Sequence, residues 1–372
     1  DYQISDRNYS RFMAYSGAEF NTGKMNLNVM IYNENDLKNQ QLQQSLSPEN
    51  IEALSIAGDD LELMQSSSIV ETEFDENRIL YRKIIENNVE FYEFSNNPSE
   101  ELYSIKFSFV GENKGNYSLV NTSTISNIFE YVPQISGNKQ GDYEPIVNLI
   151  APEKIQLAII NGLYRINDNS EIKFELANSN SDKNLFSTIN DEDNTGIATK
   201  IEIKNSLINN NNIEIINKIE YKHINKDFRS IENNYNTEFL RDWNLDSTLL
   251  DITNQFNKTQ NQSSAELIFV KKNIGSIDYK YQNLEFIEDF RGTKHNTALK
   301  YDMNNVKISS TNSFMKSKSQ LVESDFTRSY NTVMLNNDDN WTEINIDYED
   351  NSKKNLISDS LILNSHKNKS YG

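Results

Sequence analysis

Cysteine is absent from this chain of 372 residues, which excludes disulfide bonds, cysteine–zinc sites and thiol catalysis. Histidine is scarce: His223, His295 and His366 are the only three, and no two of them have the spacing of paired metal ligands. A histidine-based metal site or catalytic triad is therefore not expected. We predict no catalytic residue, no cofactor and no tightly held transition metal, and hence a protein that is not an enzyme.

Long apolar runs are absent as well. The uncharged apolar clusters are short, such as "LIFV" at 267–270, so no transmembrane helix is predicted. Basic charge is in deficit, with 36 Lys and Arg against 55 Asp and Glu and a net charge of −19. Nucleic-acid binders carry basic faces, so we expect no nucleic-acid partner. The start "DYQISDRNYS" and the end "KNKSYG" look like cuts, and we expect an internal fragment of a longer protein.

The dominant pattern is period-two alternation, which indicates strands with two different faces. In 171–178, Ile172, Phe174 and Leu176 alternate with Lys173 and Glu175. The same pattern recurs in nine further segments, at 24–32, 153–166, 196–207, 213–223, 264–272, 276–283, 297–303, 306–313 and 341–350. A helix would need apolar residues three and four positions apart, and these segments do not have them.

This alternation predicts which side chains share a face. One continuous apolar surface is expected to hold Leu27, Val29, Leu157, Ile159, Phe174, Ile201, Ile215, Leu267, Phe269 and Ile344. The opposite face is expected to hold Lys173, Lys200, Glu202, Lys218, Glu220, Glu266 and Lys280.

The connections between the predicted strands alternate in length. Short turns rich in Asn and Gly are predicted at 21–24, 166–170, 208–212, 273–276 and 304–305. Longer polar connections are predicted at 180–195, 224–262, 288–296 and 314–327. Short turns at one end and long loops at the other describe an antiparallel up-and-down meander, which is also the loop asymmetry of outer-membrane barrels.

Residues 36–150 break this rhythm and are predicted to form a small mixed α/β insertion. The segment 47–58 has the signals of a helix, with Ser47 as N-cap, Pro48 in the first turn and Gly58 at the stop. A hairpin is expected to turn at Asn87-Asn88, and a further strand at 101–111. The predicted domains are thus 1–35, the first β-hairpin of the barrel; 36–150, an insertion with one helix and several short strands; and 151–372, the β-meander.

Three features favour an all-β fold that is a partial transmembrane β-barrel. Strands such as 153–166 and 196–207 are long enough to cross a bilayer, which takes about nine to eleven residues of a tilted strand. Lys and Glu occur in mid-strand, as expected for strands that line a water-filled lumen. Aromatic residues lie near strand ends, as interfacial girdles require, at Tyr15, Phe20, Tyr164, Tyr221, Phe286, Trp341 and Tyr348. A soluble β-sandwich or propeller also alternates, with one face in its core, and stays open as an alternative.

A glycine motif occurs twice, as "GENKGNY" at 111–117 and "GNKQGDY" at 137–143. A phosphate-binding loop would need a helix after the glycines, and neither copy is followed by a helical pattern. The motif is therefore predicted to form two tight turns, in which glycine supplies positive φ and tyrosine packs as the next strand begins.

Two acidic loops have a weak resemblance to calcium-binding loops. The segment "NDEDNTG" at 190–196 places Asp191 and Asp193 before a glycine, with Glu202 at the position of the twelfth residue of such a loop. Asp191 and Asp193 are the one weak metal candidate, and a solvated loop tip is the favoured interpretation. The segment "NNDDNW" at 336–341, with the acidic pair Asp338 and Asp339, has the same character.

The segment "FLRDWNL" at 239–245 places Arg241, Asp242 and Trp243 side by side. Arg241 and Asp242 could line a pore. The favoured interpretation is a structural ion pair between Arg241 and Asp242, beside a Trp243 at the membrane interface.

Several phrases of the sequence resemble the middle of large outer-membrane β-barrel proteins of the Bacteroidota, especially flavobacteria. They are "DLKNQQLQQSLSPEN" at 36–50, the two glycine motifs, the stretch 141–201 that begins "GDYEPIVNLIAP", and "EFLRDWNL" at 238–245. The resemblance extends over roughly the first two thirds of the chain. The family has no assigned activity, so the resemblance implies location and architecture and transfers no functional residue.

These observations together predict a non-enzymatic β-barrel protein of the cell outer membrane that acts in transport, secretion or envelope assembly. Its expected partners are outer-membrane lipid and other envelope proteins. The alternative is a secreted or surface-tethered soluble β-rich module that binds a glycan or a protein.

Overall fold

The computed structural model describes residues 11–38, 46–123, 126–231, 235, 238–245, 256–303, 305–337, 340–362 and 365–372. Its contacts divide the chain into two compact units. Unit 1 consists of Asp1–Phe12, Asn35–Lys154 and Asp182–Asp191, and unit 2 of Met13–Glu34, Ile155–Ser181 and Glu192–Gly372. The fold is all-β, with few helices, as the alternation predicts.

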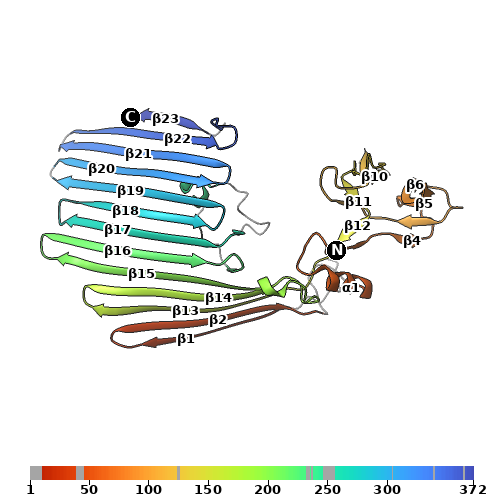
Figure 1. Cartoon of the computed structure of the whole chain (residues 1–372), viewed down its shortest axis with the longest axis horizontal. Helices are drawn as coiled ribbons and strands as arrows, with labels where there is room; N and C mark the ends of the chain where they lie inside the picture. Colours follow the sequence, from red (N-terminus) through yellow and green to blue (C-terminus); the bar gives the residue numbers. More distant parts are fainter. Residues whose placement is uncertain are drawn as a thin grey trace. The chain divides into compact units, whose positions relative to one another are not determined.

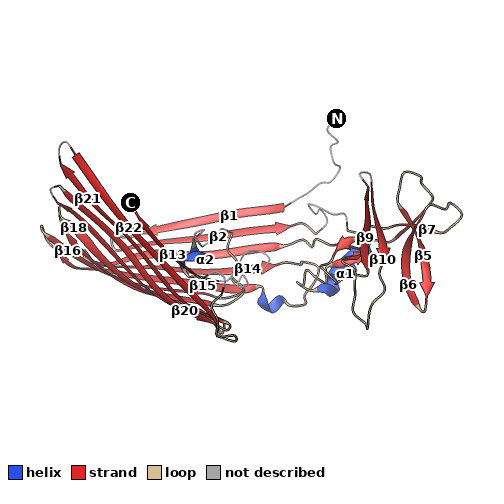
Figure 2. Cartoon of the chain, turned by 90° about the horizontal axis from the view of Figure 1, so that it is seen from above, coloured by secondary structure: helices blue, strands red, loops and turns tan. Residues whose placement is uncertain are grey.

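The main element is one sheet of thirteen strands in the order β1-β2-β13-β14-β15-β16-β17-β18-β19-β20-β21-β22-β23 (Figure 1). The strands are β1 (Arg11–Asn21), β2 (Met25–Asp36), β13 (Lys154–Asn167), β14 (Ser170–Asp182), β15 (Thr195–Asn209), β16 (Ile213–Ile224), β17 (Gln260–Lys271), β18 (Gly275–Phe286), β19 (Phe290–Met303), β20 (Val306–Ser319), β21 (Val322–Asn337), β22 (Asn340–Asn355) and β23 (His366–Tyr371). Sequence neighbours pair antiparallel throughout β14 to β23, which confirms the up-and-down meander. The sheet is open, with β1 and β23 at its edges. Figure 2 shows that the strand direction changes across the sheet, so that β16–β22 are inclined to β1 and β2.

The short turns of the sheet and the long connections β14–β15 and β16–β17 follow the prediction, and two of the predicted long connections do not. Short turns join β15 to β16 and β17 to β18, the latter with Asn273 at φ +65°. The predicted long connections at 288–296 and 314–327 are wrong, because β19 begins at Phe290 and only two residues separate β20 from β21. Polar side chains occupy both faces of these strand ends, as with Lys316 and Ser317 on β20. The alternation of apolar and polar residues that indicates a strand is therefore absent there.

Strand register confirms most of the predicted facing, because directly opposed residues lie on the same face. The apolar face contains Phe174 opposite Ile201, Ile215 opposite Phe269, Leu267 opposite Tyr279, and Val333 opposite Ile344. The charged face contains Lys173 opposite Glu202, Glu202 opposite Glu220, Lys218 opposite Glu266, and Glu266 opposite Lys280. These two faces are called the apolar face and the charged face below.

Leu157 and Ile159 on β13 are the exception, and their predicted facing is wrong. Leu157 is buried in a cluster with Ala177 and Phe228, and Ile159 packs against the same cluster. The pairing of Ala177 with Ala198 puts this cluster on the charged face. The segment 157–163 has apolar residues on both sides of the strand, so its alternation did not determine which side faces the charged surface.

Unit 1 contains the predicted helix and three small sheets. Helix α1 (Pro48–Ala57) is capped by the Ser47 hydroxyl, which accepts a hydrogen bond from the Asn50 N–H, and it stops at Gly58 with φ +63°. The fully buried Asn184 donates its amide hydrogens to the carbonyls of Leu54 and Gly58, at 2.7 and 2.6 Å. It thereby satisfies carbonyl groups that the helix end leaves without partners.

The small sheets of unit 1 are β4-β7-β5-β6, β10-β9-β11-β8 and β12-β3. Their strands are β3 (Gln65–Ser67), β4 (Val70–Thr72), β5 (Leu80–Glu86), β6 (Val89–Ser95), β7 (Leu102–Ser104), β8 (Ser108–Phe109), β9 (Tyr117–Ser123), β10 (Ser126–Tyr131), β11 (Tyr143–Glu144) and β12 (Ile146–Asn148). The hairpin at Asn87-Asn88 is confirmed, with φ +49° and +64° at the two residues. The single strand predicted at 101–111 is wrong, because it divides into β7 and β8 in different sheets.

The repeated glycine motif has a structural reason that the sequence did not reveal: the two copies pair with each other. Gly111 and Gly137 have φ of +112° and +82°, which confirms the predicted turns. The second glycines, Gly115 and Gly141, exchange backbone hydrogen bonds of 2.8 and 2.9 Å. A Cβ on Gly115 would lie 2.3 Å from the Tyr143 carbonyl oxygen, and one on Gly141 would lie 2.5 Å from that of Tyr117. Only glycine allows this close approach of two backbones.

We expect Gly115→Ala and Gly141→Ala each to destabilise unit 1 by about 1–3 kcal/mol, because the added methyl group overlaps backbone that cannot rotate away. Faster hydrogen exchange of the β9 and β11 amides, followed by mass spectrometry, would report the loss. Gly23→Ala is the control, since nothing lies within 4 Å of its Cβ position. Unchanged exchange in the Gly115 and Gly141 variants would contradict the close pairing.

Candidate functional site

The charged face of the sheet carries rows of like charge whose sign changes from row to row. Lys200 lies opposite Lys222, and in the next row Glu202 lies opposite Glu220. Opposite charges meet on the diagonals and on the next strand, as in Lys200–Glu220 and Lys173–Glu202, both at 3.2 Å. Each pair is partly exposed and contributes little stability, about 0–1 kcal/mol. The lattice therefore gives a surface that is wet and nearly neutral.

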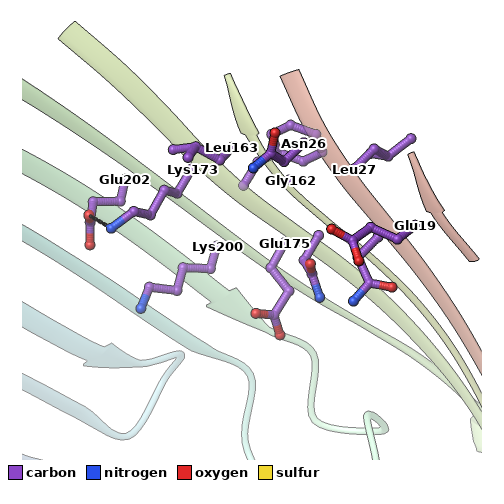
Figure 3. A pocket seen from close by; sticks show the side chains of 12 residues that line it. Glu19, Asn26, Leu27, Gly162, Leu163, Lys173, Glu175, Lys200 and Glu202 are labelled. Carbon is purple, nitrogen blue, oxygen red and sulfur yellow. Dashed lines mark hydrogen bonds and ion pairs between the residues drawn. The ribbon is translucent and has the colours of Figure 1, made fainter. Parts of the chain in front are cut away.

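One cavity of about 460 Å³ lies over this lattice between β1, β2, β13, β14 and β15. Figure 3 shows Lys173 joined to Glu202 by an ion pair, with Lys200 and Glu175 beside them. Glu175 and Lys200 are also directly opposed across β14 and β15. The lysines in this cavity thus have acidic neighbours.

A second region of the charged face is covered by the connection between β16 and β17. The described part of this connection, called the cover segment, comprises 225–231, 235, 238–245 and 256–259 and contains the short helix α2 (Phe239–Asp242). Trp243 and Phe256 pack against strand residues of β18–β21, namely Leu284, Phe286, Phe290, Met315 and Phe326. Trp243 is only 2% exposed. The charged face is therefore apolar where the cover segment lies on it.

Polar contacts fix the cover segment in place beside this apolar cluster. The Asp242 carboxylate accepts a hydrogen bond from Arg328 on β21 at 2.9 Å. The Asn244 amide donates to Ser324 and Asn351, at 2.6 and 2.9 Å. The Tyr235 hydroxyl donates to the Gln260 side-chain oxygen at 2.6 Å, and burial raises the pKa of Tyr235 above its ordinary value, so the phenol stays protonated.

Beneath α2 lies a cavity of about 490 Å³, called the α2 cavity. Its floor is formed by side chains of β17–β21 on the charged face, and Trp243 forms part of its wall. The Lys294 ammonium lies 4.4 Å from the centre of the Trp243 ring, and the Lys294 residue is 7% exposed. A cation over an indole ring is held by the ring's negative face, which compensates part of its lost hydration.

The segment "FLRDWNL" has other partners than the favoured interpretation of its sequence predicts. Asp242 pairs with Arg328, and Arg241 pairs with Glu238 at 3.1 Å, so the predicted ion pair between Arg241 and Asp242 is wrong. Trp243 is buried against the sheet, so its predicted place at an interface is wrong too. Phe286, predicted as a girdle residue, is 1% exposed and belongs to the same cluster. Asp242 does line the α2 cavity.

The weak calcium candidates lie at a loop tip, where Asp191 and Asp193 belong to a single turn of 3-10 helix, η1 (Asp191–Asp193). Glu202, the residue that would complete a calcium loop, pairs with Lys173 on the charged face instead. Within the described ranges, no three His, Asp or Glu side chains form a group that could hold a metal ion. Asp338 and Asp339 lie outside the described residues.

Sequence reasoning placed Lys280 on the charged face but missed its neighbours Lys294 and Arg328. For Lys294 the reason is that 288–296 is predicted as a connection, although β19 begins at Phe290. Arg328 directly follows the predicted connection 314–327, which the structure replaces with β20 and β21. A hairpin centred on 287–289 would have set Lys280 opposite Asn296 and Gln282 opposite Lys294, as the register has them. The available signal is the acidic pair Glu288-Asp289 between two aromatic residues, and Glu288 adopts φ +68° in the turn.

Comparisons with known proteins give no identity: no protein-family model matches the chain, and no curated protein matches its sequence. Among the helices in the described part of the chain, none has the length and hydrophobicity to span a membrane. The two faces of the sheet are therefore the features that indicate a function.

We expect Trp243→Ala to weaken the docking of the cover segment by about 3–5 kcal/mol, because it empties a buried site between α2 and the sheet. Faster chymotrypsin cleavage after Phe239, with the strand content of the sheet unchanged, would report the release. Trp341→Ala is the matched control, because the other tryptophan of the chain is 69% exposed. Equal cleavage rates in the two variants would show that Trp243 does not hold the segment.

Proposed function

We propose that this chain is a large part of a non-enzymatic β-barrel protein of the cell outer membrane that acts in transport, secretion or envelope assembly. The observation that carries the proposal is the exposure of the apolar face. Its large aliphatic side chains are about half exposed: Ile201 46%, Leu267 47%, Ile277 50% and Ile344 51%. Water is a poor solvent for such a surface, and lipid is a good one.

The width of this apolar face exceeds what soluble monomers tolerate. It extends across eight strands, from Ile201 on β15 to Ile344 on β22. At about 4.8 Å between neighbouring strands, that is about 33 Å. Soluble monomers rarely expose a continuous apolar patch of more than a few hundred Å². Strands β13–β22 are 12 to 16 residues long, which is enough to cross a bilayer with tilt.

The apolar face also ends before the strands do, at one end of the sheet. At the end nearest the tight turns β18–β19 and β20–β21 it becomes charged, with Lys316 opposite Asp325 in an ion pair of 3.4 Å. Just inside this charged border lies a row of rings, in which His295 is opposite both Tyr281 and Phe314. Aromatic side chains between an apolar band and charged residues are typical of the interfacial girdles of outer-membrane barrels.

A polar patch on β19–β21 interrupts the apolar face, and its groups bond to one another. Asn312 donates to Thr297 and to Ser310, and Ser329 donates to Asn312, at 3.3, 3.0 and 2.5 Å. Ser310 in turn donates to Asn331 at 2.6 Å. Polar groups that satisfy each other in this way are compatible with a lipid environment, where unsatisfied ones are costly.

The charged face has the properties expected of the lumen of a barrel. Its Lys and Glu rows are partly exposed, and the cover segment packs on the same face over β18–β21. The sheet as it stands has two free edges, so closure would require β1 and β23 to pair with each other or with further strands. A soluble glycan- or protein-binding module is the alternative function, and it would keep the apolar face in contact with protein.

We expect Leu267→Arg to reduce the stability of the membrane-inserted protein by roughly 2–4 kcal/mol, because it puts a cation into lipid. Ile268→Arg is the matched control: this neighbour faces the charged side opposite Asp278, where a cation is tolerated. Reversible urea unfolding from lipid vesicles measures the free energy of unfolding of both variants.

Two results would contradict the membrane proposal. The protein could remain monodisperse in buffer without detergent, or the two arginine variants could have equal stability in vesicles. Either result would favour the soluble binding module.

A further inference from the structure

The α2 cavity has a local excess of positive charge in a chain whose net charge is −19. Its lining carries three cations, Lys280, Lys294 and Arg328, and one carboxylate, Asp242. Asp242 is occupied by its ion pair with Arg328. Elsewhere on the charged face, Lys173 and Lys200 have glutamate partners, in the pairs Lys173–Glu202 and Lys200–Glu220. The lining of the cavity therefore carries three cations against one carboxylate, and that carboxylate already has a partner.

The two lysines of the cavity differ from Lys173 and Lys200 in their partners. Within the described ranges, neither Lys280 nor Lys294 takes part in an ion pair, and the Lys294 ammonium lies over the Trp243 ring. Lys294 is more than nine-tenths buried. A buried ammonium without an anionic partner is costly, so the site gains when an anion enters.

The remaining polar lining consists of neutral groups that can pair with hydroxyls. Gln262, Gln282 and Asn296 contribute amides, and Thr311 and Ser313 contribute hydroxyls. Asn296 already donates to the Gln282 oxygen at 2.8 Å, which leaves the Gln282 amide hydrogens available to a ligand. The rings of Phe239 and Trp243 add an apolar wall on the α2 side. Amides, hydroxyls and a flat apolar wall together suit the polar edges and apolar faces of a sugar ring.

We propose that the α2 cavity binds a small polyhydroxylated organic anion of the acidic-sugar class. Its carboxylate would lie between the Lys280 and Lys294 ammonium groups, and its hydroxyls would bond to the amides of β17–β19. The volume of about 490 Å³ accommodates one or two sugar rings and is in the range of ordinary small-molecule sites.

This inference goes beyond the proposed function, and it rests on the cavity alone. It does not require that the apolar face meets lipid. Binding is measured on the whole chain in detergent micelles, so a negative result there leaves the membrane proposal intact, and failure of the membrane proposal leaves the binding site intact.

The test is titration calorimetry with D-glucuronate, with D-glucose as the uncharged analogue and sulfate as the inorganic anion. Glucuronate is expected to bind at least ~10-fold more tightly than either, because only it uses both the cations and the hydroxyl partners. Lys280→Gln and Lys294→Gln should each weaken glucuronate binding by ~10-fold, while Lys173→Gln, which lies in the other cavity, should leave it unchanged. Circular dichroism checks that each variant is folded, and Lys280→Gln suffices should Lys294→Gln fail to fold.

Four outcomes would overturn the proposal. Glucose could bind as well as glucuronate, which would remove the role of the lysines. Sulfate could bind as tightly as glucuronate, which would make the site a general anion site without sugar recognition. Absence of glucuronate binding, or equal binding by the Lys280 and Lys173 variants, would show that the cavity is not the site.

Discussion

Side chains along a β-strand point alternately to opposite faces, and this constraint underlies the main features of unit 2. In β15, Ile201 faces one side and Lys200 and Glu202 the other, and the antiparallel register repeats that division on the neighbouring strands. Shifting one strand by one residue would exchange its two sets of side chains between the faces. The sheet therefore requires two different surroundings at once, one suited to half-exposed aliphatic side chains and one suited to rows of charge.

The charged face is modified at one place, and that modification creates the candidate site. The cover segment brings Phe239, Trp243 and Phe256 onto a face that elsewhere carries ion pairs. Their burial dehydrates the neighbouring Lys294, whose ammonium keeps the Trp243 ring as its contact. The same face thus carries a partly exposed, nearly neutral lattice of ion pairs on β14–β16 and, a few strands away, a partly apolar cavity with excess positive charge. Such a combination selects ligands by charge and shape rather than by charge alone.

Sequence patterns predicted the parts of the fold that depend on local chemistry. The alternating strands, helix α1 with Ser47 and Gly58, and the Asn87-Asn88 turn all follow from residue type and spacing. The parts that failed depend on partners distant in sequence. The pairing of Gly115 with Gly141, the burial of Trp243 and the facing of Leu157 are decided by contacts that no local pattern contains. Lys294 and Arg328 were missed for the same reason, since only the register brings them to one cavity.

The most direct test of the two-faced account uses the absence of cysteine, which allows single labelling sites without prior substitution. Spin labels would be placed one at a time along β17 in vesicles, at Ala265, Leu267 and Phe269 and at Glu266, Ile268 and Val270. Collision rates with oxygen and with a water-soluble nickel chelate would then be compared. The account predicts oxygen access at the first set and chelate access at the second, alternating residue by residue. Exclusion of both reagents from the first set would contradict it, because those side chains would then be buried in protein.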